Sequence, residues 1–161
     1  MTIDLFIEKL DLLGKDLPNY LERIARRESN TMTTSIITRL TEIGVDAGNN
    51  KFGGTAIRLD SSGVYSESHG RKRRKGGFQV SHMDFTFSNN MLKSVDEKSS
   101  KKNKNMVQVV TGAIGESNRD KMNWNVDREG RELLYPNSKE IETLVKNFSA
   151  QLEAEVKGRL G

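Results

Sequence analysis

The apolar residues of this chain are periodic near both ends and sparse in between. Between residues 44 and 77 the chain carries eight of its 14 glycines and few apolar side chains. A loop of that length without its own core is usually functional, or orders only against a partner. The two ends must therefore supply the core, and an apolar fraction of 34% predicts one modest domain over residues 1–161.

The N-terminal part, residues 1–44, predicts two helices. The first is a short amphipathic helix that Gly14 ends, and the second begins at Pro18 and ends before Gly44. Serine and threonine residues between positions 29 and 34 predict a place where the second helix frays or kinks.

The best-defined element is a C-terminal helix over residues 137–158. Asn137 has the side chain of an N-cap, and Glu140 follows at the capping-box spacing. The apolar stripe of this helix comprises Ile141, Leu144, Val145, Phe148, Leu152 and Val156. Gly158 is expected to end the helix, and the stripe would pack either on a sheet or on the long N-terminal helix.

The part between, residues 78–134, predicts a small antiparallel sheet. Residues 78–87 alternate and predict one strand, and the β-branched residues 106–111 predict another. Residues 91–95 fit either a strand or a short helix, so the strand at 106–111 has two candidate partners. A polar hairpin tip is expected over residues 98–105.

A further short helix is expected over residues 118–125, with Met122 and Trp124 as core residues. The expected fold is therefore α+β, a small antiparallel sheet packed with N- and C-terminal helices. Residues 45–77 would project from it as a long, flexible, glycine-rich basic loop.

Two basic clusters are candidate binding surfaces. The first is a run of five cations between glycines, namely Arg71, Lys72, Arg73, Arg74 and Lys75. The second comprises Lys98, Lys101, Lys102 and Lys104. Because five adjacent charges do not pack in a core, the first run predicts a solvated loop. The net charge is only +4, so the basic character is local.

Three interpretations of these clusters remain open. Cationic runs are most often solvated loops, and they also dock on acidic protein surfaces. They can bind DNA without sequence preference through phosphate charge. Neither cluster is interleaved with the aromatic residues that stack on bases, and no helix-turn-helix or zinc-finger spacing is present.

Enzymatic signatures are absent from the sequence. There is no cysteine, no phosphate-binding Gly-x-x-x-x-Gly-Lys-Ser/Thr loop and no Gly-x-Ser-x-Gly segment. His82 and Asp84 would share one face of the predicted strand, but two groups fall short of the three ligands of a catalytic zinc site. We therefore expect a polar pair at a surface or between subunits, and a protein without catalysis, metal or cofactor.

No apolar run approaches the length of a membrane span, and the N-terminus lacks the basic region of a signal peptide. Together with the missing cysteines, this predicts a protein made and kept in a cytoplasm, without membrane contact.

Several short segments carry a further signal. They are Gly44-Val45-Asp46-Ala47-Gly48, Lys51-Phe52-Gly53-Gly54, Tyr65, the run from His69 to Gln79, Met83 to Val95, and Asn125 to Tyr135. With the capped terminal helix, they resemble the head–tail joining, or tail-completion, proteins of tailed bacteriophages. The resemblance extends from about Thr33 onward, and Asn89 stands where such proteins usually have a glycine.

The resemblance implies a structural virion protein, in a ring of the neck or tail terminator that joins the portal and adaptor complex to the tail. Its partners would be copies of itself, in a six- or twelvefold ring, and the portal, adaptor and tail proteins. It would be assembled in the bacterial host cytoplasm. Phe52, Tyr65 and His69 would contact a neighbouring subunit, and residues 71–75 would face either that neighbour or the packaged DNA.

Overall fold

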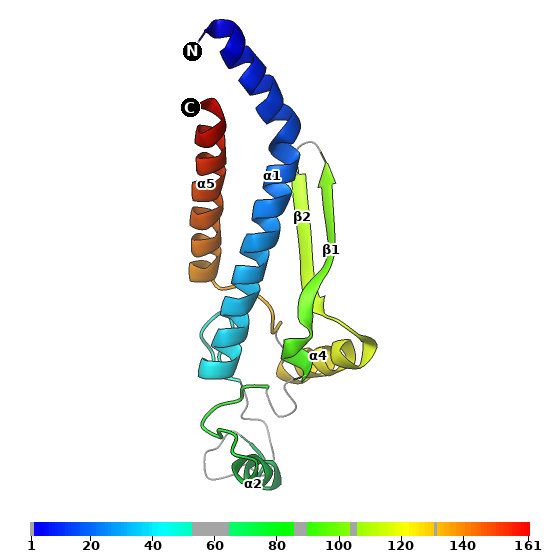
Figure 1. Ribbon diagram of the computed structural model, residues 1–161. Coiled ribbons are helices and arrows are strands. Elements are labelled where there is room, and N and C mark those ends of the chain that lie inside the picture. Colours follow the sequence, from blue (N-terminus) through cyan, green and yellow to red (C-terminus); the bar gives the residue numbers. More distant parts are fainter. Residues whose placement is uncertain (1, 53–64, 86–89, 104–105, 131) are drawn as a thin grey trace.

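The structure, a computed structural model, describes residues 2–52, 65–85, 90–103, 106–130 and 132–161. Its elements are α1 (Ile3–Thr38), the π-helical turn η1 (Arg39–Ile43), α2 (Glu67–Lys75), α3 (Asn90–Lys93), β1 (Val95–Asn103), β2 (Met106–Ala113), α4 (Glu116–Glu129) and α5 (Ser138–Leu160). The fold is α+β, with a two-stranded antiparallel sheet and helices at both ends, as predicted. Helix α1 lies between α5 on one side and the β1–β2 hairpin on the other (Figure 1). None of the described helices is both long and apolar enough to cross a membrane.

Helix α1 is continuous over 36 residues, so the predicted break at Gly14 is wrong. Pro18 has no N–H to donate to the carbonyl of Gly14, yet the helix passes through both residues and bends in its N-terminal part (Figure 1). The predicted fraying between residues 29 and 34 is also absent from α1. There the hydroxyls of Thr31 and Thr34 donate to backbone carbonyls four residues earlier and stay within the helix.

Gly44 ends the helical part, as predicted. It follows η1 with a left-handed backbone, φ 72°, and its N–H donates to the carbonyl of Arg39. A Cβ atom at this position would lie 2.7 Å from the carbonyl oxygen of Met83 and 2.7 Å from the ring of His82. Both the backbone angle and the close approach therefore require glycine here.

Strand β1 consists largely of residues with low β-propensity, and the sequence predicted a hairpin tip there. Strand β1 pairs with β2 from Val95↔Ala113 to Asn103↔Met106, so most of the predicted hairpin tip is strand. Pairing with the β-branched residues of β2, and packing against α1, offset the low β-propensity of lysine, serine and asparagine. The predicted strand over residues 78–87 is wrong, because residues 78–85 run irregularly and 86–87 lie outside the described residues.

Two of the short-helix expectations hold. Residues 90–93 form α3, which is the helical alternative for the 91–95 segment. Helix α4 covers the predicted 118–125 segment and extends it at both ends. Met122 lies in the core, but Trp124 is 60% exposed, so its predicted burial is wrong. The ring of Trp124 instead lies under the guanidinium of Arg128.

The core is small and lies where the end of α1 meets α3, α4 and the last residues of β2, between α2 and the rest of the molecule (Figure 1). Its buried members are Ile36, Leu40, Phe52, Met91, Leu92, Ala113, Met122 and Leu133. Along the rest of its length α1 has no comparable cluster of buried residues within the described chain.

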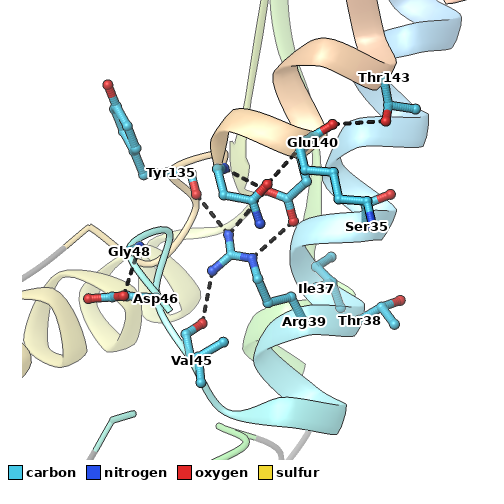
Figure 2. Close-up of polar contacts among 12 residues, drawn as sticks. Ser35, Ile37, Thr38, Arg39, Val45, Asp46, Gly48, Tyr135, Glu140 and Thr143 are labelled. Carbon is cyan, nitrogen blue, oxygen red and sulfur yellow. Dashed lines mark hydrogen bonds and ion pairs between the residues drawn. The ribbon is translucent and has the colours of Figure 1, made fainter. Parts of the chain in front are cut away.

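Helix α5 has the predicted capping box, with the Asn137 side chain accepting from the N–H of Glu140 and the Glu140 carboxylate accepting in return. It packs on α1 and runs through Gly158, where the predicted end is wrong. The buried guanidinium of Arg39 donates to Glu140, at 2.9 Å, and to the carbonyls of Val45 and Tyr135 (Figure 2). The cap of α5 is thereby tied to the end of α1.

Candidate interaction surfaces

The first basic cluster lies on a helix, so its predicted loop conformation is wrong. Helix α2 spans Glu67–Lys75, with an acid in its first turn and cations in its last, which suits the helix dipole. Part of the predicted loop, residues 53–64, lies outside the described residues. The helix can pack because one of its five cations is buried.

That buried cation is Arg73, which is 1% exposed. Its guanidinium donates to the carboxylate of Asp84 at 2.7 Å and to the carbonyl of Gln79 at 2.9 Å. It also lies over the ring of Tyr65, 4.7 Å from the centroid. Arg73 is therefore a structural residue that holds α2 against the segment around Asp84, and is not available to a partner.

The carboxylate that binds Arg73 has two further donors. The carboxylate of Asp84 receives hydrogen bonds from the Tyr65 hydroxyl and from the Gln79 side chain, at 3.3 and 2.7 Å. Burial, with the Asp84 charge adding to it, raises the pKa of Tyr65 to about 12, so the phenol stays protonated and donates. Sequence reasoning missed this cluster, because Arg73 stands among four cations of the same kind.

The other cations of α2 form its exposed face. Arg71, Lys72, Arg74 and Lys75 are exposed, and helical geometry places them around the side opposite Arg73. Arg71 is paired with Glu67 one turn earlier, at 3.2 Å, and both side chains remain largely in solvent. We call these four residues the basic face of α2.

The second basic cluster is divided. Lys102 turns toward α1, where it pairs with Glu22 at 2.7 Å and donates to Asn19. The hydrogen bonds from Lys102 and Arg26 lower the pKa of Glu22. Lys98 and Lys101 are exposed on the hairpin, whose tip lies far from α2 (Figure 1). Lys104 lies outside the described residues, and the two clusters do not form one surface.

The predicted subunit-contact residues Phe52, Tyr65 and His69 are packed against other parts of the same chain. Phe52 is buried with its ring edge-to-face to Phe85, 5.1 Å between centroids. His69 is half-buried and stacks on Tyr65, also at 5.1 Å. Burial, and then the charges of Arg73 and its neighbours, lower the pKa of His69.

His82 and Asp84 do not form the pair that a shared strand face would give. The ring of His82 meets the carbonyl of Thr41 at 2.8 Å, whereas Asp84 is bound by Arg73. Nowhere in the described part of the chain do three or more histidine, aspartate or glutamate side chains gather as metal ligands would.

An exposed apolar surface belongs to the first turns of α1. Ile3, Phe6, Ile7 and Leu10 follow the spacing i, i+3, i+4, i+7, which places them on one face of the helix. All four are exposed, Ile7 by 53%, because this end of α1 extends past α5 and the hairpin (Figure 1). We call them the apolar stripe of α1. The sequence predicted a short amphipathic helix over these residues, without stating what its apolar face contacts.

Among the described residues, the apolar stripe of α1 and the basic face of α2 are exposed at opposite ends of the molecule (Figure 1). Comparison of the chain with family models, curated proteins and solved structures finds no match.

Proposed function

We propose that this chain is a structural protein of a tailed-bacteriophage virion. It would form a ring in the neck or tail terminator, joining the portal and adaptor complex to the tail. Its partners would be copies of itself and the neighbouring portal, adaptor and tail proteins. The proposal combines the resemblance of the sequence segments with one structural observation, the exposed apolar stripe of α1.

The stripe supports assembly because exposed apolar residues of this size are costly when they are contiguous. Burying one fully exposed isoleucine, leucine or phenylalanine side chain is favourable by about 1.5–3 kcal/mol. A contiguous apolar patch rimmed by polar residues is typical of a protein–protein contact. In a cyclic ring each subunit presents different faces to its two neighbours, so the stripe would meet another part of the next copy.

A charge placed in the stripe tests the proposal. Ile7→Glu should give a monomer by native mass spectrometry and should not enter virions, whereas the unaltered chain should form a ring. The matched control is Leu12→Glu, which is 51% exposed on the opposite face of the same helix and should still assemble. Under conditions that keep all three chains monomeric, both variants should melt at the temperature of the parent, since neither side chain is buried in the monomer. A parent chain that remains monomeric and never joins particles would contradict the proposal.

Non-specific DNA binding is the second candidate, and the basic face of α2 favours it. Arg71, Lys72 and Lys75 can be changed to glutamine while the buried Arg73 is kept. The apparent affinity for duplex DNA should then fall, and the slope of log K against log salt should lessen by about 0.9 for each lost phosphate contact. A matched variant at Lys98 and Lys101 should bind as the parent does. No binding by the parent at low salt would exclude this function.

A further inference from the structure

A cavity of about 410 Å³ lies between the C-terminal half of α1 and the N-terminal half of α5. Glu28 lines it from α1, at the end where Gln151 of α5 comes close. Arg39 and Lys139 lie toward its other end, beside the capped start of α5. Figure 2 shows that end, with Ser35 and Thr38 on α1 and Thr143 on α5.

Glu28 is the unusual member of this lining, because its side chain is buried with one oxygen unsatisfied. It is 4% exposed, and its Oε1 accepts a hydrogen bond from Gln151. Its Oε2 is shielded from solvent and has no hydrogen-bond partner among the residues that the structure describes. A buried carboxylate oxygen without a donor is destabilising, so a donor from outside the described residues would stabilise the site.

Four hydroxyls of the cavity lining do not supply that donor. Thr31, Thr34, Ser35 and Thr143 each donate their hydrogen to a backbone carbonyl four residues earlier in their own helix. Their oxygens therefore face the cavity as acceptors only. A group with several hydrogen-bond donors matches these four oxygens.

The charges of the lining favour a cation at the Glu28 end. Arg39 is neutralised by its ion pair with Glu140 at 2.9 Å. Lys139 is separated along α5 from Gln151, the partner of Glu28, by twelve residues, or about 18 Å. Arg27 lines a separate groove, which Gln151 also lines.

We propose that this cavity binds a protonated primary amine or a guanidinium group, with the Glu28 carboxylate balancing its charge and the hydroxyl oxygens accepting its hydrogens. The group would be carried by a free alkylamine or by a lysine or arginine of a second copy of the chain. The inference does not depend on the proposed function, since it concerns a different surface from the apolar stripe.

The test is a titration of the full chain with n-butylammonium chloride, followed by NMR at the Gln151 side-chain amide and the Thr31 backbone amide, with sodium chloride as the ionic-strength reference. The parent should show saturable shifts, and Glu28→Gln should bind at least tenfold more weakly. Glu142→Gln, an exposed acid of α5, should bind as the parent does. The absence of saturable shifts, or equal binding by Glu28→Gln, would overturn the proposal.

A second measurement uses the melting temperature of the unliganded chain. Glu28→Gln should melt higher than the parent, because it removes an uncompensated buried charge and its amide can donate to the hydroxyl oxygens. A lower melting temperature would mean that the carboxylate already has its donor, and would also overturn the proposal. Sedimentation with and without butylammonium identifies the source, since only an amine from a second copy would make the assembly dissociate on titration.

Discussion

At the scale of single residues, Arg73 differs from the other cations of α2 because its guanidinium is buried against Asp84. Two ion pairs of the same helix can therefore be compared directly. The Arg73–Asp84 pair is nearly inaccessible to solvent, whereas the Arg71–Glu67 pair is largely exposed. When an exposed charge loses its partner, water solvates it. A buried charge that loses its partner stays unsolvated, which destabilises the fold.

We expect Asp84→Asn to lower the free energy of unfolding by about 3 kcal/mol or more, since it leaves the Arg73 charge buried and unbalanced. Glu67→Gln, the same chemical change in the exposed pair, should alter it by less than about 0.5 kcal/mol. Urea denaturation of the two variants measures both values. Similar losses would show that α2 is not held through Arg73.

His69 should make stability depend on pH. Its pKa is lowered in the folded chain below the ordinary value of 6.5, so the unfolded chain takes up the proton first. The stability that neutral His69 contributes to the folded chain is fully present above pH 6.5. It is lost as the pH falls through 6.5 and then through the lowered folded-state pKa. His69→Phe keeps a ring to stack on Tyr65 and cannot titrate. Its unfolding free energy should fall less than the parent's between about pH 7.5 and about pH 5, and parallel curves would contradict this.

Single residues also show where sequence reasoning stops. The capping pair of Asn137 and Glu140 was predictable, because both partners lie within one helical turn. The burial of Arg73 was not, since its partner Asp84 follows an irregular segment and four similar cations surround it. Local pairs have a spacing that the sequence displays, whereas pairs made by tertiary packing do not.

At the scale of elements, α1 shows how packing overrides local signals. Gly14 and Pro18 predict a break, yet contacts with α5 and the hairpin follow on the C-terminal side and the helix continues. The opposite error occurred at residues 78–87, where alternation predicted a strand but the chain instead supplies Gln79 and Asp84 to Arg73. In both places the chain makes side-chain contacts that the local pattern does not display.

Gly14→Ala should stabilise the chain by about 0.5–1 kcal/mol, because the position is helical and a Cβ atom would meet nothing within 4 Å. Gly130 offers the matched control, since its Cβ position is equally open but its φ is +64°. Gly130→Ala should therefore destabilise, by about 1 kcal/mol. Thermal melts of both variants measure whether each is more or less stable than the parent. A loss of stability in Gly14→Ala would show that α1 is strained there.

At the scale of the whole molecule, stability is unevenly distributed along α1. Its C-terminal third enters the core and is covered by α5 and the hairpin, whereas its first turns extend beyond both (Figure 1). The α+β class and the helices at both ends were predictable from periodicity. The extension of α1 beyond α5 and the hairpin was not predictable. Amphipathic periodicity shows that a helix has an apolar face, but not whether that face packs on the same chain or on another.

Hydrogen exchange should report this difference. In the monomer, the backbone amides of residues 6–13 should exchange fast and those of residues 24–40 slowly, because only the latter are packed on both sides. In assembled particles the amides of residues 6–13 should become protected. Fast exchange of these amides in both states would place the subunit contacts elsewhere.

The ion pair between Arg39 and Glu140 gives the extended helix a mechanical property. With 36 residues at 1.5 Å each, α1 is a rod about 54 Å long, clamped at its C-terminal end by this pair and by the core. The hairpin holds the helix as well, since Lys102 donates to Asn19, so only the turns before Asn19 are unsupported. A load taken up at Ile3 and Phe6 would therefore pass first to the hairpin and then along the helix to the clamp beside the start of α5.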